Sequence, residues 1–366
     1  METILDTVII GAGPAGLAVA GSLAKSRTKV LIFEKEGAVG PLWSRHYDRL
    51  HLHTTRGNSG LPGFPIPAKS PRYLPRKYFL SYLEKYRERF NLRIQFGEMV
   101  TNLKKEDHHW KVTTDKGIYS SKNVVVATGL NGMPFLPKYP GLESFQGNVI
   151  HSSKYKNGKT YAGRKTLVVG FGNSGAEIAL DLAESKADVG LCIRGPVHVV
   201  PRDFFGIPVQ TLAILTHWIP TWLLDPIFGV LVRLVVGDLK KFGISPPTQG
   251  INALSTSSGR VPVLDVGTLR KIKAGEISVF PGIKSFHATE VEFVDGTKKS
   301  CDSVIFATGY RPNFLDVIEA EIDSKGRPIC KSIQGLYFIG FYYPLTGALR
   351  QISTEAKDIA RSIFKY

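Results

Sequence analysis

Two glycine-rich turns of the same kind constrain the fold of this chain more than any other feature. The turn GAGPAG at residues 11–16 follows the apolar run 8–10, and the turn GFGNSG at residues 170–175 follows the apolar run 167–169. Glycines with this spacing allow a tight turn and bring the backbone close to a pyrophosphate at a helix N-terminus. Because an Ala-rich helix pattern follows both turns, the sequence predicts an α/β fold with two dinucleotide-binding (Rossmann-like) lobes.

The residue at the end of the next strand differs in charge between the two copies. The apolar run 30–33 ends on Glu34, whereas the run 189–193 ends on Arg194. A carboxylate suits the two hydroxyls of an unphosphorylated ribose and repels a 2′-phosphate, with which a guanidinium would pair. We therefore predict FAD in the first lobe and NADP(H) in the second.

Further candidate residues surround these turns. Two Ala-Thr-Gly segments, at 127–129 and 307–309, follow apolar strands and let the chain pass close to a cofactor. The complete set of predicted cofactor-binding residues is Gly11, Gly13, Pro14, Ala15, Gly16, Glu34, Lys35, Leu42, Trp43, Thr54, Ala127, Thr128, Gly129, Gly170, Gly172, Asn173, Ser174, Gly175, Arg194, Ala307, Thr308, Gly309 and Tyr310. No side chain is assigned a catalytic role.

The order of the motifs predicts that one lobe is inserted into the other. The expected elements are β-α-β units over 5–33 and 166–193, a helix over 75–90, a three-stranded meander over 99–126, a strand over 336–340 and a helix over 347–364. We expect an FAD-binding domain formed by residues 1–150 and 303–366, and an NADP-binding domain formed by residues 151–302 with an apolar, substrate-side segment at 201–260. Residues 340–347 should lead into a helix whose N-terminus faces the flavin.

Composition excludes several classes of protein. With 366 residues the chain is longer than one hydrophobic core usually serves. Its formal net charge of +16 suits dinucleotide phosphates, but the basic residues are scattered and form no nucleic-acid-binding module. The cysteines (Cys192, Cys301 and Cys330) form no CxxC motif, which argues against a flavin disulfide reductase and for a reducing compartment. With the first strand expected close to Met1, no room is left for a targeting peptide, and we expect a cytoplasmic protein.

The apolar segment 211–236 allows more than one interpretation. It contains Pro220, Asp225, Pro226 and Arg233, so it has no uninterrupted run of the ~20 apolar residues that span a bilayer. A pair of amphipathic helices that cover the active-site cleft is the first interpretation. A peripheral membrane contact is the second, and a true membrane span the third.

One motif between the two lobes identifies a family. Residues 145–155 read FQGNVIHSSKY, which is FxGxxxHxxxY and resembles the identifying motif of the flavin-containing monooxygenases. Together with both glycine turns and the segment 307–310, the resemblance covers nearly the whole chain. We interpret His151 and Tyr155 as structural residues of the junction between the lobes, not as catalytic residues.

Several stretches resemble the YUCCA subgroup of that family, which is associated with indole-3-pyruvate oxidation in auxin biosynthesis. They are GNSG at 172–175, HVVPR at 198–202, GDLKKFG at 237–243 and PVLDVGT at 262–268. The first half departs from the plant pattern, because residues 50–62 lack the Phe-Cys-Glu-Leu-Pro run, and the tail at 340–347 differs too. Thr54 and Asn58 are the candidates for the position where many members place an Asn near the flavin.

The resemblance implies an FAD- and NADPH-dependent monooxygenase that oxygenates a small organic substrate with O2 through a C4a-(hydro)peroxyflavin. An aromatic 2-oxo acid such as indole-3-pyruvate is one candidate substrate, and its oxidation would be decarboxylating. An N- or S-oxygenating flavin monooxygenase and a non-catalytic NADP(H)-sensing flavoprotein are the alternatives. His51 and His53 have no further ligand cluster beside them in the sequence, so we expect no metal site.

Overall fold

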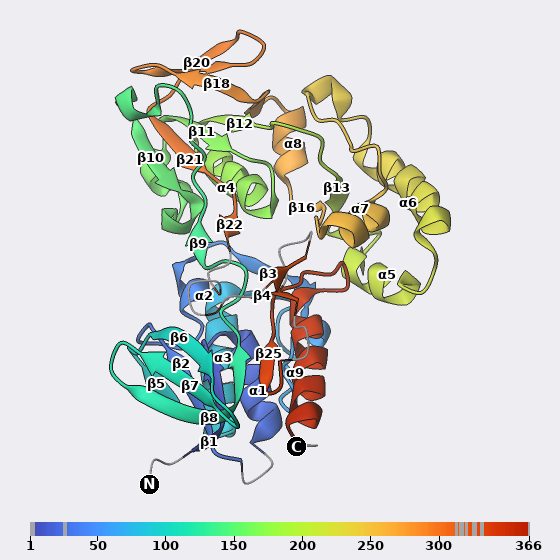
Figure 1. Cartoon of the computed structure of the whole chain (residues 1–366). Helices are drawn as coiled ribbons and strands as arrows, with labels where there is room; N and C mark the ends of the chain where they lie inside the picture. Colours follow the sequence, from blue (N-terminus) through green and yellow to red (C-terminus); the bar gives the residue numbers. More distant parts are fainter. Residues whose placement is uncertain are drawn as a thin grey trace. The chain divides into compact units, whose positions relative to one another are not determined.

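The computed structural model describes residues 4–24, 28–311, 314, 318, 321–323, 328–329 and 333–364 (Figure 1). The chain forms two compact units. Unit 1 comprises Met1–Ser44, Thr54–Met133 and Tyr310–Tyr366, and unit 2 comprises Arg45–His53 and Pro134–Gly309. The predicted α/β fold with one lobe inserted into the other is therefore confirmed.

Unit 1 is built on a seven-stranded sheet in the order β5-β2-β1-β8-β7-β6, with β25 paired to β8. The strands are β1 (Leu5–Ile10), β2 (Val30–Glu34), β5 (Ile94–Phe96), β6 (Val100–Lys105), β7 (Trp110–Thr114), β8 (Ile118–Val126) and β25 (Leu336–Phe338). β5, β2, β1, β8 and β25 pair in parallel, whereas β6, β7 and β8 form the antiparallel meander predicted for 99–126.

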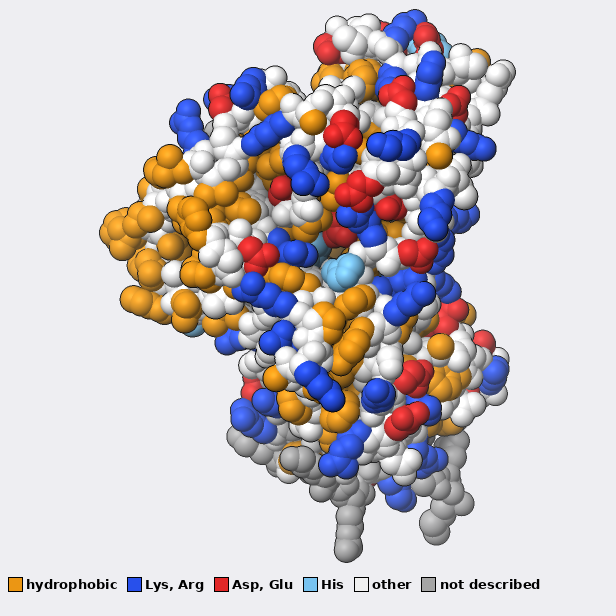
Figure 2. Space-filling view, turned by 180° about the vertical axis from the view of Figure 1, so that it is seen from behind, with side chains coloured by type: hydrophobic (Ala, Val, Ile, Leu, Met, Phe, Trp, Pro, Cys, Tyr) orange, Lys and Arg blue, Asp and Glu red, His pale blue; other side chains and the backbone are white. Residues whose placement is uncertain are grey.

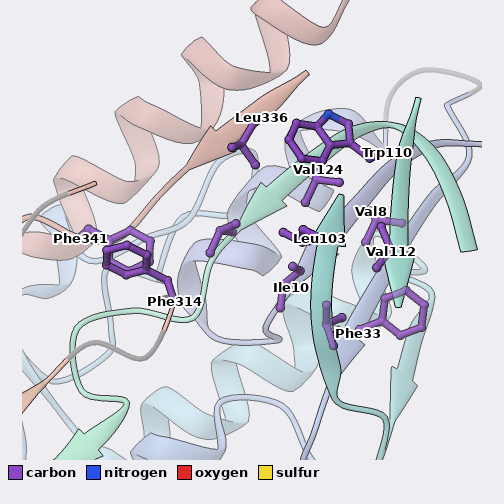
Figure 3. Packing of buried hydrophobic residues seen from close by; sticks show 12 residues of the cluster. Val8, Ile10, Phe33, Leu103, Trp110, Val112, Val124, Phe314, Leu336 and Phe341 are labelled. Atoms are coloured by element: carbon purple, nitrogen blue, oxygen red, sulfur yellow. The ribbon is translucent and has the colours of Figure 1, made fainter. Parts of the chain in front are cut away.

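Apolar side chains from distant parts of the sequence form the core on one side of this sheet. Figure 3 shows Val8 and Ile10 of β1 together with Val124 of β8, Trp110 and Leu336. All of them are buried. Since β25 supplies Leu336, the core of unit 1 is completed by residues that follow unit 2 in the sequence.

Helices cover the sheet of unit 1. They are α1 (Pro14–Leu23), α2 (Pro41–Arg45), α3 (Arg76–Arg89) and α9 (Ala348–Phe364), and α1 packs against both α3 and α9. The helix predicted for 75–90 is α3, and its aromatic side chains Phe79, Tyr82 and Tyr86 are buried. They anchor the loop before the helix, because the Tyr86 hydroxyl donates to the Pro62 carbonyl over 2.8 Å. Short elements join these helices and strands: β3 (His51–Thr55), η1 (Arg56–Asn58), β4 (Tyr73–Pro75), β9 (Met133–Pro134), β22 (Tyr310–Arg311), β23 (Glu321–Ile322) and β24 (Pro328–Ile329).

Unit 2 is built on a five-stranded, fully parallel sheet in the order β10-β21-β11-β12-β17. The strands are β10 (Asn148–His151), β11 (Lys165–Val169), β12 (Asp188–Cys192), β17 (Ile277–Phe280) and β21 (Ser303–Phe306). β11, β12 and β21 are apolar and buried almost throughout, as expected for parallel strands that are covered on both faces. α4 (Asn173–Glu184) connects β11 to β12 and completes the second predicted β-α-β unit.

The remaining elements of unit 2 surround this sheet. The strands are β13 (Val199–Pro201), β14 (Asp203–Phe204), β15 (Ile207–Pro208), β16 (Val263–Asp265), β18 (Ile283–Phe286), β19 (Glu290–Phe293) and β20 (Lys298–Ser300). The helices are η2 (Leu142–Ser144), η3 (Ser152–Lys154), η4 (Gly158–Tyr161), α5 (Val209–Thr216), α6 (Thr221–Val236), η5 (Lys240–Phe242), α7 (Ile251–Ser258) and α8 (Thr268–Lys273). Segment 211–236 thus contains two helices, and no helix in the described part of the chain is both long enough and apolar enough to cross a membrane.

The bounds of the two units differ from the predicted domain limits of 150/151 and 302/303. β10 and β21 pair with each other in the sheet of unit 2, so that Asn148 and Ser303 are neighbours. Unit 2 therefore reaches from Pro134 to Gly309. It also includes Arg45–His53, which the sequence analysis placed in the first lobe. The pairing of β10 with β21 produces the first difference. Contacts with α4, such as the 2.8 Å ion pair between Arg49 and Glu184, place Arg45–His53 in unit 2.

Candidate dinucleotide-binding sites

In the first turn each glycine meets a different steric requirement. Gly11 has a φ of +104°, and a Cβ there would lie 2.8 Å from the Ala127 carbonyl oxygen. A Cβ on Gly16 would lie 2.0 Å from the Gly11 carbonyl oxygen, because α1 packs tightly against β1. Beside Gly13, in contrast, no heavy atom lies within 4 Å of the Cβ position. The open space at the second glycine suits a pyrophosphate.

The second turn in unit 2 repeats this arrangement. Gly170 has a φ of +107°, and its Cβ would lie 2.7 Å from the Ala307 carbonyl oxygen. Gly175 would place a Cβ 2.0 Å from the Gly170 carbonyl oxygen, and the space beside Gly172 is empty to 4 Å. The residues of both turns therefore fit a dinucleotide, with a tight turn, an open position and a close helix–strand contact in the same order.

Both Ala-Thr-Gly segments lie beside their glycine turns. The Ala127 amide donates to the Ile10 carbonyl over 2.9 Å, and the Ala307 amide donates to the Val169 carbonyl over 2.8 Å. The threonine hydroxyls differ. Thr308 donates to the Phe135 carbonyl, whereas the Thr128 hydroxyl is buried and has no hydrogen-bond partner among the described residues. An unpaired buried hydroxyl near the first turn is consistent with a ligand group at that place.

Glu34 is buried at the end of β2 and holds the first turn. One carboxylate oxygen accepts from the Ala12 amide over 2.8 Å, and the other accepts from the Glu36 amide over 3.0 Å. Burial raises the pKa of Glu34 above its ordinary value of 4.5, although both amide hydrogen bonds oppose this shift. The neighbouring side chain of Lys35 is exposed. The negative charge thus lies inside the turn, at the position predicted to meet a ribose.

Arg194 at the end of the corresponding strand of unit 2 is exposed. Among the described residues, no carboxylate forms an ion pair with its guanidinium. It lies two residues after the end of β12, whereas Glu34 is the last residue of β2. A free guanidinium at this place is available to a phosphate group.

The other predicted residues of unit 1 lie near the first turn or in local turns. The Gly40 amide donates to the Ala12 carbonyl over 2.9 Å, which places the start of α2, with Leu42 and Trp43, beside that turn. Thr54 shares a 2.6 Å hydrogen bond with Ser59, while the Asn58 amide donates to the Thr55 hydroxyl over 3.2 Å. Local hydrogen bonds thus hold both candidates for the flavin-side position.

The tail of the chain returns to the first turn. A Cβ on Gly340 would lie 3.0 Å from the Ala15 Cβ, and α9 begins eight residues later at Ala348. This places the segment that follows β25 against the start of α1. A position of residues 340–347 beside a flavin ring stays a prediction.

In unit 2 the YUCCA-like stretches brace α4. The side-chain oxygen of Asn173 accepts from the Leu264 amide over 2.8 Å, and the Thr268 hydroxyl donates to the Ala176 carbonyl over 2.9 Å. Asp265 accepts from the Leu269 amide over 2.9 Å and so caps α8. The stretch 262–268 therefore fixes the N-terminus of α4, where a pyrophosphate would bind.

A buried polar cluster next to the second turn was missed by the sequence analysis. Glu177 of α4 is 4% exposed, and its carboxylate lies 3.1 Å from the His53 imidazole. Tyr47 forms hydrogen bonds with Ser174 and Glu177, and burial together with the Glu177 charge raises the Tyr47 pKa well above its ordinary value. Tyr47 and His53 are distant from α4 in the sequence. The one indication of the cluster in the sequence is therefore Glu177, an acidic residue on an otherwise apolar face of the helix.

The two histidines considered as metal ligands are used in other ways. His51 bonds the Arg49 carbonyl through Nδ1 over 2.7 Å, and His53 faces Glu177. Among the described residues there is no group of three or more His, Cys, Asp or Glu side chains that could hold a metal ion.

The FxGxxxHxxxY motif stabilises unit 2. The Ser153 amide donates to Nδ1 of His151 over 3.1 Å, so that the proton is on Nε2, which donates to the Gly309 carbonyl over 3.0 Å. Burial lowers the pKa of His151 below its ordinary value of 6.5. The Tyr155 hydroxyl donates to Asp181 of α4 over 2.6 Å. The motif thus connects the second Ala-Thr-Gly segment and α4 to β10 and the residues that follow it.

The described cysteines are buried, free thiols. Burial raises the pKa of Cys192 and that of Cys301 to about 12 each, and Cys192 donates to the Pro281 carbonyl. A thiol with so high a pKa is a poor nucleophile. Cys330 lies outside the described residues.

Comparison with known proteins agrees with this geometry. The family described as pyridine nucleotide-disulphide oxidoreductase matches residues 8–203, a stretch that contains both glycine turns. The probable indole-3-pyruvate monooxygenase YUCCA7 of Arabidopsis thaliana is 39% identical over 97% of this chain and 87% of its own length. Indole-3-pyruvate monooxygenase YUCCA4 of rice, Oryza sativa subsp. japonica, is 38% identical over 97% of this chain and 86% of its own length.

The chain belongs to the YUCCA-like flavin monooxygenases. It is thus an oxidoreductase of the monooxygenase class. The resemblance found in the FxGxxxHxxxY motif and in the stretches after it is confirmed. Within the broad family named for disulphide reduction, the YUCCA-like chain buries Cys192 and Cys301 as protonated thiols.

Solved structures confirm the fold of this YUCCA-like chain. A flavin-containing monooxygenase from Stenotrophomonas maltophilia superposes with a TM-score of 0.75 at 22% identity, over 100% of this chain and 99% of that one. Cyclohexanone monooxygenase from Rhodococcus sp. Phi1, solved with NADP+, gives a TM-score of 0.76 at 20% identity, over 100% of this chain and 85% of that one.

Proposed function

We propose that the protein is an FAD- and NADPH-dependent monooxygenase that oxidatively decarboxylates an aromatic 2-oxo acid. The single observation that carries this proposal is the repeated turn geometry, with a buried carboxylate at the end of one strand and a free guanidinium at the end of the other. The 2-oxo acid is inferred from the printed names of relatives that are 38–39% identical to this chain.

The balanced reaction consumes one 2-oxo acid, one O2, one NADPH and one proton. It yields the carboxylic acid that is one carbon shorter, CO2, NADP+ and water. One oxygen atom of O2 enters the new carboxylate and the other is reduced to water. The chemistry that a flavin would supply when bound is to accept hydride from NADPH and to activate O2.

In this proposal each unit holds one dinucleotide. The Gly13 position of unit 1 admits the pyrophosphate of FAD, and Glu34 accepts hydrogen bonds from its ribose hydroxyls. In unit 2, Gly172 admits the pyrophosphate of NADPH and Arg194 pairs with the 2′-phosphate. The contacts of Asn173 and Glu177 support these roles because they fix the start of α4.

No side-chain nucleophile or metal is needed for this reaction. What the chain must supply is orientation and exclusion of water, since water at the site would release the activated oxygen as hydrogen peroxide. We also propose that the enzyme works in a reducing compartment such as the cytoplasm, because the two described cysteines are free thiols.

The test measures NADPH consumption by the purified, flavin-loaded protein with aromatic 2-oxo acids, and with amines and sulfides as comparison substrates. We expect a 2-oxo acid to stimulate consumption and to yield CO2 and the shortened acid in equal amounts. Oxygenated amine or sulfide without any decarboxylation would move the assignment to an N- or S-oxygenase. Hydrogen peroxide as the sole product with every substrate would contradict monooxygenation.

A further inference from the structure

The outward face of α5 and α6 is apolar and exposed. On α6, Ile227, Val230 and Leu234 are 63%, 62% and 78% exposed, and their i, i+3, i+7 spacing places them on one side of the helix. Trp222, in the first turn of α6, is 76% exposed. Trp218, which follows α5, is 74% exposed. Figure 2 shows the hydrophobic side chains gathered on the left, where the half-turn from Figure 1 brings α5 and α6. We call Leu215, Trp218, Trp222, Leu223, Ile227, Val230 and Leu234 the apolar face.

The opposite side of α6 is already packed, so the helix cannot bury this face by a simple rotation. α6 contacts α7 and β13 within unit 2, and Phe228 lies 5.3 Å from Phe204 between ring centroids. Asp225 accepts from the amides of Asn252 and Ala253 over 2.8 and 2.9 Å and thereby caps α7. These contacts fix which side of α6 points outward. Large apolar side chains gathered in this way mark an interaction surface.

The charges next to the apolar face select the kind of partner. Arg233 lies within α6, and Lys240 and Lys241 follow its C-terminus, and all three are exposed. From residue 204 to residue 260 the only acidic residues are Asp225, which is used as the cap of α7, and Asp238. With a net charge of +16, a second copy of this chain would be repelled. An anionic lipid surface would be attracted, by about 1 kcal/mol for each basic residue near it.

We propose that the apolar face docks the protein on the anionic surface of a phospholipid bilayer. α6 lies in the plane of the interface, with its large side chains at the boundary between headgroups and acyl chains. Trp222 suits that depth because an indole combines an apolar body with a polar N–H group. Trp218, whose N–H donates to the Leu215 carbonyl over 2.8 Å, adds its exposed apolar ring. Lys240 and Lys241 then contact the lipid phosphates.

Vesicle flotation with the full-length protein tests this proposal without any substrate. We expect binding to phosphatidylcholine vesicles that contain phosphatidylglycerol, and an affinity that falls about tenfold between low and high salt. Tryptophan fluorescence supplies a second readout, since bromine-labelled lipids should quench Trp218 and Trp222 but not the buried Trp110. Absence of binding to the anionic vesicles would overturn the proposal.

Two sets of variants separate the contributions. Trp222→Ser, Ile227→Ser and Leu234→Ser combined should lower vesicle affinity by at least about tenfold. The control set Met99→Ser, Ile118→Ser and Val294→Ser removes exposed apolar side chains from other places and should bind as the unchanged protein does. Equal binding by both sets would refute docking through the apolar face.

The basic residues are tested in the same way. Arg233→Gln, Lys240→Gln and Lys241→Gln combined should lower affinity for anionic vesicles about tenfold or more and leave binding to pure phosphatidylcholine unchanged. Lys77→Gln, Lys85→Gln and Arg89→Gln, which are exposed on α3, are the matched control and should have no effect. Thermal unfolding confirms that each set is folded. If the unchanged protein instead dimerises through this face and ignores vesicles, a second copy replaces the bilayer as the partner.

Discussion

The two glycine turns share a backbone geometry and differ in where their distinguishing charge lies. In unit 1 the Glu34 carboxylate is buried and bonds the turn itself. In unit 2 the Arg194 guanidinium is exposed, with no ion pair among the residues that the structure describes. The first arrangement keeps its charge out of water and uses it to hold the backbone of the turn. The second leaves its charge solvated and available to a ligand.

The largest effects are expected where the two turns are sterically identical. Gly16→Ala and Gly175→Ala each place a Cβ 2.0 Å from a backbone oxygen, which should lower the free energy of unfolding by about 2–3 kcal/mol. Chemical denaturation measures this loss. A variant as stable as the unchanged protein would show that the close helix–strand contact is absent from that turn.

Arg194→Asp should weaken NADPH binding about thirtyfold, or about 2 kcal/mol, because an acid would face the 2′-phosphate. NADH has no such phosphate and its binding should change little. The apparent constants for NADPH and NADH in flavin reduction give the comparison, and Arg270→Asp on the exposed side of α8 is a matched charge control. An equal loss of affinity for NADPH and NADH would show that Arg194 does not contact the 2′-phosphate.

The second glycines should separate the ligands of the two turns. Gly13→Ala and Gly172→Ala add a methyl group to open space, so stability should change by no more than about 0.5 kcal/mol. Each methyl group would obstruct one pyrophosphate and weaken its binding about tenfold. Flavin content should fall only for Gly13→Ala, and NADPH affinity only for Gly172→Ala. The reverse pattern would exchange the cofactors of the two units.

The smallest effect concerns the buried charge of unit 1. Because the folded pKa of Glu34 is raised above 4.5, ionisation of this group opposes folding as the pH rises through that pKa. Glu34→Gln removes this ionisation but also removes the acceptor of one of the two backbone amides, so the flavin-free variant should lose stability at pH 4 and lose less of it at pH 7, by a difference of no more than about 1 kcal/mol. It should also weaken flavin binding. Unfolding curves at both pH values test this. A gain of stability at pH 4 alone would show that the ionised form of Glu34 stabilises the fold.

Local patterns predicted most of the fold. The β-α-β units, the helix α3 and the meander each follow from periodicity or turn residues within a short stretch of sequence. The bounds of unit 2 could not be predicted in this way. β10 belongs to the second sheet because it pairs with β21, more than 150 residues later, and no local pattern reports such a pairing.

The same distinction applies to the candidate sites. The glycine turns, Glu34 and Arg194 could be found because strand, turn and charge follow one another in the sequence. The Tyr47–His53–Glu177 cluster could not, since segment 45–53 reaches α4 only through the folded chain. Its polar groups stabilise one another inside the protein and leave no periodic signal.

The path of the chain between the units has a consequence for biosynthesis. The polypeptide passes from one unit to the other four times, and β25 and α9 follow the last passage. The large insert, with its five parallel strands, has emerged from the ribosome before the strand that completes the other sheet is made. We therefore expect the inserted portion to acquire protease resistance first on nascent chains, while the portion begun earliest waits until the final helix is translated.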